Sequence, residues 1–426
     1  MARKMKDSGI EWIGEIPEGW EVAKLKNIVS IVRGGSPRPI EAYMSDNDND
    51  VNWIRISDTE KGSKYITHTS RKLIASGISK SRFIKRGSLI LTNSMSFGEP
   101  YILDIDGCIH DGWVAFSDFK KIDKEFLYYF LTSPLAKIQF EQQVDGGVVK
   151  NLNIDKIGDT VILLPSLIDQ NKIIAHLDSL TSETNSLLSK TITSIEEYKK
   201  LKQAVITQAV TKGVRGEREM KDSGVEWIGE IPKEWDILNL VAHTSMLTPM
   251  RDRPENLDGP IPWIRIEDFD GKYISSSKAS LGVSKETVRS MNLKIYPVGT
   301  ILCTSSCIMG KCAIVSRELV SNQRFIGIIP DQNTCENFLY YLMLSNSERM
   351  NYLATGALQA NLSRSSFEHL KVQFPSYQEQ KEISDYLDTK CAEIDKLIAK
   401  KEQLVKELES YKKSLIYEVV TGKREI

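Results

Sequence analysis

Hydrophobic and polar residues alternate in two different ways along the chain. Up to Pro165, short apolar runs rich in β-branched residues are separated by Gly, Pro, Asn and Asp turn signals. These runs predict short strands in a mixed α/β (α+β) domain, and the clearest are residues 51–56, 88–92 and 160–164. After Pro165 the apolar residues recur at steps of three and four, which predicts a long amphipathic helix.

The whole pattern occurs twice. Residues 5–17 return as residues 220–232 with a single change, Ile10 to Val225, in thirteen positions. Shorter anchors follow in the same order at offsets of 210 to 212: residues 53–56 (Trp-Ile-Arg-Ile) return at 263–266, residues 126–129 at 338–341, and residues 164–166, with one change, at 374–376. Short segments that are repeated in the same order, with little sequence identity between them, predict two copies of one fold whose variable parts have different functions.

A seven-residue periodicity runs through both helical segments. The apolar seam predicted in the first segment consists of Ile173, Leu177, Leu180, Leu187, Tyr198, Leu201 and Val205. The seam predicted in the second segment consists of Ile383, Leu387, Ile394, Leu397, Leu404, Leu408, Tyr411 and Leu415. Helices of roughly 40 residues would be about 60 Å long and need a partner for these seams.

We therefore expect the two helices to pack as an antiparallel coiled coil with a globular domain at each end. The alternative, in which each helix folds back on its own globular domain, stays open because the seams contain polar residues. These residues are Thr184, Thr191, Lys390 and Lys401.

Composition adds limits to this picture. The chain has 426 residues, of which 41% are hydrophobic and 27% are charged, as in a folded protein of two or more domains. The N-terminal residues contain no apolar signal segment, and no window approaches the roughly 18 apolar residues of a membrane helix. The six cysteines are then expected to be reduced thiols, and we expect a cytoplasmic protein without a membrane partner.

Catalytic signatures are missing from the sequence. No G-x-G-x-x-G run, H-E-x-x-H motif, nucleophile elbow or Asn/Asp-Pro-Pro-aromatic motif of an amino-methyltransferase occurs, and residues 305–312 depart from a phosphate loop. Cys303, Cys307 and Cys312 lack zinc-ligand spacing and a nearby histidine, so buried thiols are the favoured interpretation. We expect no enzyme activity, no cofactor and no metal site. The three tryptophan pairs, 12/227, 20/235 and 53/263, favour core packing over base stacking, because residues common to two readers cannot distinguish two sequences.

Positive charge is local although the net charge is only -1. Residues 55–86 contain nine basic and two acidic residues, as a surface that neutralises phosphates requires, although a merely solvated face stays open. The candidates in this stretch are Arg55, Lys61, Lys64, Arg71, Lys72, Lys80, Arg82 and Lys85. Residues 265–294 are weaker, with six basic and four acidic residues, and contribute Arg265 and Lys278.

A loop offers further candidates. Residues 87–98 align with residues 299–310, and in both a strand leads to small polar side chains that differ between the copies. Such side chains can read different base edges, while an ordinary connecting turn stays equally open. The candidates here are Asn93, Ser94, Ser96, Ser305, Ser306 and Lys311.

Together these residues resemble one family, the specificity subunits of type I restriction-modification systems. The resemblance covers nearly the whole chain. It depends on the Trp-Ile-Gly-Glu-Ile-Pro run of residues 12–17, residues 146–152, the helix start at residues 163–170, and the repetition of all three. The second copy departs mildly, because residues 356–362 keep one of the two paired glycines.

The resemblance implies target recognition domains at 1–165 and 213–375, followed by helical spacers at 166–212 and 376–426. It implies a non-catalytic reader of double-stranded DNA that directs two modification subunits, which use S-adenosylmethionine, and separate restriction subunits to a bipartite target. The residues agree with this, since two unlike domains on a stiff spacer can read two unlike half-sites at a fixed gap. A stand-alone DNA methyltransferase or nuclease, and a coiled-coil scaffold without a DNA role, stay open as alternatives.

Overall fold

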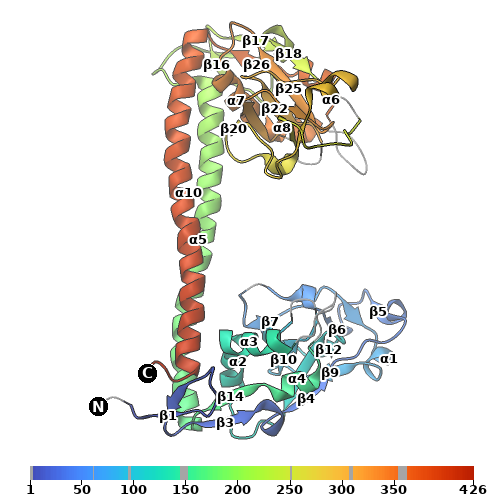
Figure 1. Cartoon of the computed structure of the whole chain (residues 1–426), viewed down its shortest axis with the longest axis vertical. Helices are drawn as coiled ribbons and strands as arrows, with labels where there is room; N and C mark the ends of the chain where they lie inside the picture. Colours follow the sequence, from blue (N-terminus) through green and yellow to red (C-terminus); the bar gives the residue numbers. More distant parts are fainter. Residues whose placement is uncertain are drawn as a thin grey trace. The chain divides into compact units, whose positions relative to one another are not determined.

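The computed structural model describes residues 3–426 except 61, 95–96, 144–151, 250–251, 307–309 and 354–361. The chain forms two compact units, shown in Figure 1. Unit 1 comprises Met1–Ile192 and Glu402–Ile426, and unit 2 comprises Thr193–Lys401. Each unit contains one globular head, called head 1 (residues 3–166) and head 2 (residues 213–376), and part of both long helices.

Head 1 is built on two five-stranded sheets. The first has the order β4 (Ser30–Arg33), β13 (Trp113–Ser117), β10 (Leu89–Thr92), β11 (Pro100–Leu103) and β7 (Tyr65–Ile66). The second has the order β5 (Met44–Ser45), β8 (Lys72–Leu73), β6 (Val51–Ile54), β12 (Gly107–Ile109) and β9 (Arg82–Ile84). Two antiparallel pairs complete the described strands: β1 (Met5–Asp7) with β2 (Glu15–Pro17), and β3 (Glu21–Lys24) with β14 (Val161–Leu164).

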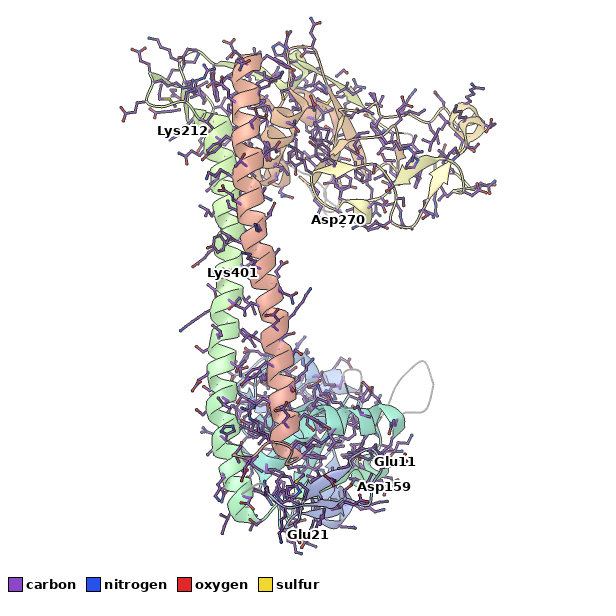
Figure 2. The ribbon with its side chains drawn as sticks, turned by 60° about the vertical axis from the view of Figure 1, so that its left-hand side comes forward. Glu11, Glu21, Asp159, Lys212, Asp270 and Lys401 are labelled. Carbon is purple, nitrogen blue, oxygen red and sulfur yellow. The ribbon has the colours of Figure 1, made fainter. Side chains whose placement is uncertain are left out.

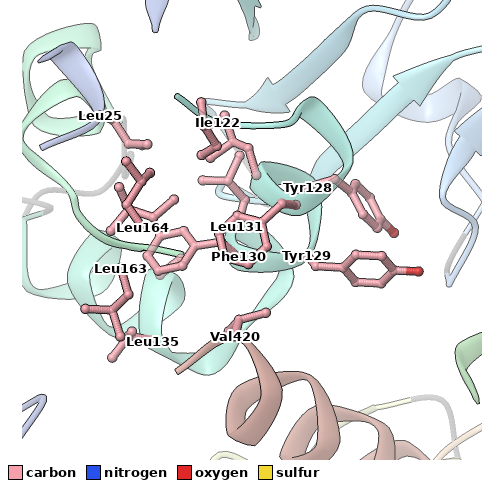
Figure 3. Packing of buried hydrophobic residues seen from close by; sticks show 14 of the residues in the cluster. Leu25, Ile122, Tyr128, Tyr129, Phe130, Leu131, Leu135, Leu163, Leu164 and Val420 are labelled. Carbon is pink, nitrogen blue, oxygen red and sulfur yellow. The ribbon is translucent and has the colours of Figure 1, made fainter. Parts of the chain in front are cut away.

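The α-helices among the described residues of head 1 are α1 (Ala75–Ile78), α2 (Lys124–Thr132), α3 (Pro134–Gln143) and α4 (Ile154–Asp159). The α2 helix begins where the Asp123 carboxylate accepts a hydrogen bond from the backbone N–H of Glu125, 2.7 Å away. Its next residues, Phe126 to Leu131, are all buried, because α2 lies in the middle of the main core of unit 1. Figure 3 shows part of that core, in which α2 residues meet Leu163 and Leu164 of β14 and Val420 of the C-terminal helix.

Head 2 repeats this plan. Its main sheet has the order β18 (Thr244–Leu247), β25 (Phe325–Pro330), β22 (Ile301–Thr304), β23 (Cys312–Val315) and β20 (Tyr273–Ile274), and a three-stranded sheet has the order β21 (Gly282–Val283), β19 (Ile261–Ile264) and β24 (Val320–Ser321). The strand pairs are β15 (Met220–Asp222) with β16 (Glu230–Pro232), and β17 (Asp236–Asn239) with β26 (Lys371–Phe374). Its helices are α6 (Lys285–Ser290), α7 (Glu336–Ser345), α8 (Ser347–Leu353) and α9 (Arg364–Glu368). The equivalent order of strands confirms the predicted duplication of a mixed α/β domain.

The two long helices, α5 (Leu167–Lys212) and α10 (Tyr377–Val420), lie side by side in each unit (Figure 1). In unit 2 the Lys401 ammonium lies 5.6 Å from the centre of the Tyr198 ring, and Lys202 pairs with Asp395 at 2.6 Å. The residue numbers rise along one helix as they fall along the other, so the helices run antiparallel. This confirms the predicted antiparallel packing.

The predicted seam is partly wrong in register. Leu187, Leu201, Leu397, Leu404 and Tyr411 are exposed, and Leu180 is only half-buried. The residues one position later turn inward instead, and they are Thr181, Leu188 and Lys202 on α5, and Ile398, Val405 and Lys412 on α10. At Leu187-Leu188, Leu397-Ile398 and Leu404-Val405 both adjacent residues are apolar, so the sequence there fits either register and packing selects one.

The other predicted seam residues do turn inward. Ile173, Leu177, Ile383, Leu387, Ile394 and Leu415 are buried, while Tyr198, Val205 and Leu408 are half-buried. At the ends of the helices these residues enter the cores of the heads: Ile173 and Leu177 join the core of unit 1, and Ile383 and Leu387 join that of unit 2. Leu415 of α10 also belongs to the core of unit 1, and Val210 of α5 to that of unit 2, so each head core contains residues from both long helices.

The tryptophan pairs divide into two groups. Trp20, Trp235, Trp53 and Trp263 are buried, as predicted. For Trp12 and Trp227 the prediction of core packing is wrong, because 48% and 43% of their surfaces are exposed. Trp12 and Trp227 each follow a glycine in the turn between two short paired strands, and this turn places the indole ring outside the core.

Candidate nucleic-acid interface

The second sheet of head 1 brings together several of the predicted basic residues. Arg55 follows β6, Lys72 lies on β8 and Arg82 lies on β9. Within this sheet Asn52 of β6 faces Lys72, whose ammonium donates to the Asn52 amide oxygen at 2.8 Å. Arg71 is exposed, and its carbonyl accepts a hydrogen bond from the Trp53 N–H. Arg55, Arg71, Lys72 and Arg82 thus lie on or directly beside strands of one sheet, with Arg82 on its edge strand, two strands away from β6.

Arg55 is held in place by a short turn. The Asp58 carboxylate accepts the Arg55 backbone N–H at 2.9 Å, and the Arg55 guanidinium donates to the Ser70 hydroxyl at 2.5 Å. Burial opposes ionisation of Asp58, but hydrogen bonds from Ser70 and Arg55 outweigh burial, so the pKa of this carboxyl lies below its usual range. The turn is repeated in head 2, where the Arg265 N–H donates to Asp268 at 2.7 Å.

Lys64 does not join this group. Only 16% of its side chain is exposed, and its ammonium pairs with Glu125 at 2.5 Å and Asp178 at 2.7 Å. It also lies over the rings of Tyr128 and Tyr129. We therefore exclude Lys64 from the DNA-binding candidates, because its charge is already neutralised inside unit 1.

Head 2 contains the same arrangement. Lys272 pairs with Asp388 of α10 and lies 5.6 Å and 5.0 Å from the ring centres of Tyr340 and Tyr341. The Tyr341 hydroxyl donates to the same carboxylate at 2.6 Å. We call these two arrangements the lysine clamps. Each joins a head to a long helix within its own unit.

The remaining basic candidates are more dispersed. Lys80 is exposed and lies 4.9 Å from the centre of the Tyr43 ring, while Lys85 is exposed directly after β9. In head 2, Lys278 pairs weakly with Asp270 at 3.4 Å, and Figure 2 shows Asp270 on the surface of that head. Lys311 is exposed next to β23. Lys61 and Ser96 lie outside the described residues, as do nearly all of residues 146–152 and 356–362.

The predicted loop residues are mostly buried. Asn93 and Ser306 are buried, whereas Ser94 and Ser305 are half-buried. The Asn93 N–H donates to the Gly112 carbonyl at 3.0 Å, and the Ser305 N–H donates to the Arg324 carbonyl at 2.8 Å. This loop therefore supports a second loop, which follows β12 in head 1 and β24 in head 2.

That second loop lines a pocket in each head, and neither pocket was predicted from the sequence. Head 1 has a pocket of about 920 Å³ between Arg38, Trp53, Arg55 and His110. Head 2 has one of about 300 Å³ between Arg253, Trp263, Arg265 and residues 322–324. A signal was present in the sequence, since Arg38-Pro39 and Arg253-Pro254 are repeated at the same offset of 215 as residues 5–17.

The described part of the chain offers no group of three or more His, Cys, Asp or Glu side chains that could hold a metal ion. Cys303 and Cys312 are buried as free thiols with sulfur atoms 2.8 Å apart, and burial raises the pKa of Cys303 well above its usual value. None of the helices among the described residues is both long and apolar enough to span a membrane.

Two known proteins with similar sequences are named as specificity subunits of type I restriction enzymes. Residues 17–197 and 236–407 both match the model of the family described as type I restriction modification DNA specificity domain. The type I restriction enzyme MjaIX specificity subunit of Methanocaldococcus jannaschii is 34% identical over 41% of each chain. A second protein of that organism, the putative MjaX specificity subunit, is 26% identical over 96% of this chain and 95% of its own length.

Solved structures show the same fold. A chain from a structure described as the basis of complex assembly and conformational transition of the type I R-M system superposes with a TM-score of 0.74 at 15% identity, covering 96% of this chain and 99% of that one. The HsdS subunit from Thermoanaerobacter tengcongensis superposes with a TM-score of 0.50 at 15% identity, covering 96% and 98%. With two family matches that fall on the two repeats, the chain belongs to the type I restriction-modification DNA specificity family.

Proposed function

We propose that the chain is the non-catalytic specificity subunit of a type I restriction-modification complex. Head 1 and head 2 each bind one half of a bipartite, asymmetric target in double-stranded DNA, and the long helices set the gap between the halves. Modification subunits then methylate the target, and restriction subunits cleave DNA in the cytoplasm. The chain itself needs no cofactor for this role, because the methyl donor binds to the modification subunits.

One observation carries this proposal: the two heads have the same framework but unlike loops. The strand order, the buried tryptophans and the lysine clamps are equivalent in the two heads. The loop after β12 reads His110-Asp111-Gly112, whereas the equivalent loop after β24 reads Asn322-Gln323-Arg324. A shared framework with different exposed loops suits two readers of two different sequences.

An exposed surface common to both heads supports the binding of two copies of one partner. The nearly identical residues 5–17 and 220–232 place Trp12 and Trp227 on the surface. Trp12 borders a pocket of about 390 Å³ with Leu135, Ile138 and Tyr417, and the Arg349 guanidinium lies 3.9 Å from the centre of the Trp227 ring. Because equal surfaces cannot distinguish unlike half-sites, we assign them to two modification subunits.

Exposed apolar residues on the long helices extend this proposed docking region. Leu187, Leu404 and Tyr411 are exposed in unit 1, and Leu201 and Leu397 are exposed in unit 2. Each of the five lies one position before an inward-facing residue, so the exposed residues recur with the same period as the residues that turn inward. Large exposed apolar residues at regular spacing suit the binding of further helices.

The alternative is a stand-alone DNA-modifying enzyme. Purified chain is incubated with labelled S-adenosylmethionine and with total DNA from a host strain that lacks this gene, in the presence and in the absence of the modification subunit. We expect methyl transfer only when the modification subunit is present, and only to DNA that contains the target. Methyl transfer by the chain alone would contradict the proposal and favour the enzyme.

A further inference from the structure

The two pockets occupy equivalent places in the two heads. In head 1, β6 ends at Ile54 and pairs in parallel with β12; in head 2, β19 ends at Ile264 and pairs in parallel with β24. Each pocket lies where these two strands end, beside an arginine that precedes a proline. Equivalent pockets in two copies of one fold that have diverged elsewhere indicate a common task.

Part of the lining is the same in both pockets. Trp53 and Trp263 form a buried wall, and Arg55 and Arg265 follow them after one residue. About a third of each of these arginine side chains is exposed, and both arginines begin the turn described above. Arg38 and Arg253 add an exposed arginine to each lining. Arg38 pairs with Asp111 at 3.7 Å, Arg55 with Asp58 at 3.4 Å and Arg265 with Glu267 at 3.1 Å, but more than a third of each of these arginine side chains stays exposed, unlike Lys64. Each pocket therefore offers two partly or fully exposed arginines beside an indole ring.

The backbone of the unlike loop is also fixed in the same way. In head 1 the Gly112 N–H donates to His110 Nδ1 at 2.7 Å, and in head 2 the Arg324 N–H donates to Asn322 Oδ1 at 3.0 Å. The hydrogen bonds from Asn93 and Ser305 to the carbonyls of these residues complete the equivalence. Gly112 and Arg324 thus occupy the same place in the two heads.

The side chains on this common backbone differ. A Cβ atom at Gly112 would lie 2.2 Å from Cε1 of His110, so the histidine ring excludes a side chain there. At the equivalent place, Arg324 and its neighbour Gln323 are exposed and line the pocket of head 2. The pocket of head 1 has the carboxylate of Glu41 in its lining, whereas the described lining of the head 2 pocket contains no acidic residue.

We propose that each pocket is the place where its head reads the base edges of one DNA half-site. This inference rests on the proposed function and assigns it to particular residues. The shared arginines, Arg38 and Arg55 in head 1 and Arg253 and Arg265 in head 2, contact the sugar-phosphate backbone. The unlike residues, Glu41 in head 1 and Gln323 and Arg324 in head 2, determine which bases are accepted.

The division follows from the chemistry of the two kinds of contact. Phosphates are the same at every step of a duplex, so side chains common to both heads fit them and carry no sequence information. Base edges differ, and the side chains that read them must differ as well. Arginine donates two hydrogen bonds to guanine, glutamine pairs with adenine, and a carboxylate accepts from the cytosine amino group. The pocket of head 2 is therefore suited to purine edges, and that of head 1 to a cytosine amino group.

The test uses the full chain in complex with its modification subunits. Binding to duplexes with each base pair of the target changed in turn is measured for the parent complex and for Arg324→Ala. Arg289→Ala is the matched control, because Arg289 is an exposed arginine of head 2 outside the pocket lining. We expect Arg324→Ala to lower discrimination by about 5- to 150-fold at one or two base pairs of a single half-site, and Arg289→Ala to leave the profile unchanged.

The shared arginines are tested in the same assay. Arg38→Ala and Arg253→Ala should weaken binding to every duplex by a similar factor and lower the slope of log affinity against log salt by about one each. Circular dichroism confirms the fold of each variant. If the parent complex discriminates between duplexes and Arg324→Ala has the same profile as Arg289→Ala, the pocket assignment is wrong while the proposed function stands. If the parent complex shows no preference for any duplex, the proposed function itself fails.

Discussion

Head 1 and head 2 share their framework and differ in one loop that lines each proposed DNA-reading pocket. Lys64 and Lys272, Trp53 and Trp263, and the aspartates of the two turns occupy equivalent sites with equivalent partners. By contrast, the loop that ends in Gly112 in one head ends in Arg324 in the other, on a backbone held by the same hydrogen bonds. Side chains thus differ between the two heads on a backbone that both share, so a comparison of the heads separates the residues of the shared framework from the proposed DNA-reading residues.

The largest expected effect concerns the long helices, to which both heads are attached. Ile195 of α5 and Ile394 of α10 are each 7% exposed, whereas Ile192 of α5 is 51% exposed. We expect Ile195→Ala and Ile394→Ala to lower the free energy of unfolding by about 2–4 kcal/mol each, because both changes leave a cavity in the seam. Ile192→Ala, the matched control, should change it by no more than about 0.5 kcal/mol. Chemical denaturation of the full chain measures all three, and equal effects of Ile192→Ala and Ile195→Ala would contradict the observed register.

The lysine clamps give a smaller effect and test the equality of the two heads directly. Lys64→Met and Lys272→Met should each destabilise the chain by about 1–2 kcal/mol, since a largely buried cation is lost from a carboxylate that remains partly solvated. Thermal unfolding measures the loss. DNA affinity of the folded variants should stay within about twofold of the parent, because neither lysine touches phosphate in this account. A uniform drop in affinity with a lower salt slope for Lys64→Met would return Lys64 to the DNA surface.

The smallest effect is a response to acid that only head 1 should show. Burial, with a contribution from the nearby Arg55 charge, lowers the pKa of His110, although Asp111 and Asp58 oppose this. A histidine with a lowered pKa in the folded state contributes stability that is present above its unfolded pKa of about 6.5 and is lost as the pH falls through the folded value. Unfolding temperatures measured between pH 7.5 and 5.5 should fall less for His110→Asn, which installs the side chain that head 2 has at this place, than for the parent. Identical pH profiles would remove His110 as the cause.

Much of the fold could be predicted from the sequence, because repetition and periodicity are local signals. The repeated residues 5–17 and 220–232 revealed the duplication, and the apolar period after Pro165 revealed α5. The register of the seam was half wrong because Leu397 and Ile398 are adjacent and equally apolar, so only the packing of the partner helix distinguishes them.

The site was harder to predict because it depends on distant partners. From the sequence alone Lys64 is a candidate DNA-binding residue, because its partner Asp178 is 114 residues away. Arg38 and Arg253 lie outside the basic stretches, and they join Arg55 and Arg265 only when the strands that precede them are folded. The sequence predicts that Asn93 and Ser306 read base edges, yet both are buried, and the Asn93 N–H instead supports the neighbouring loop through the Gly112 carbonyl.

The most direct test of two unlike readers on one chain is the pattern of methylated bases in the host genome. Single-molecule sequencing compares the host with a strain that lacks this gene. We predict a methylated motif that disappears with the gene and that consists of two unlike halves separated by a gap of constant length. A motif that is continuous, or whose halves are the same, would contradict this prediction.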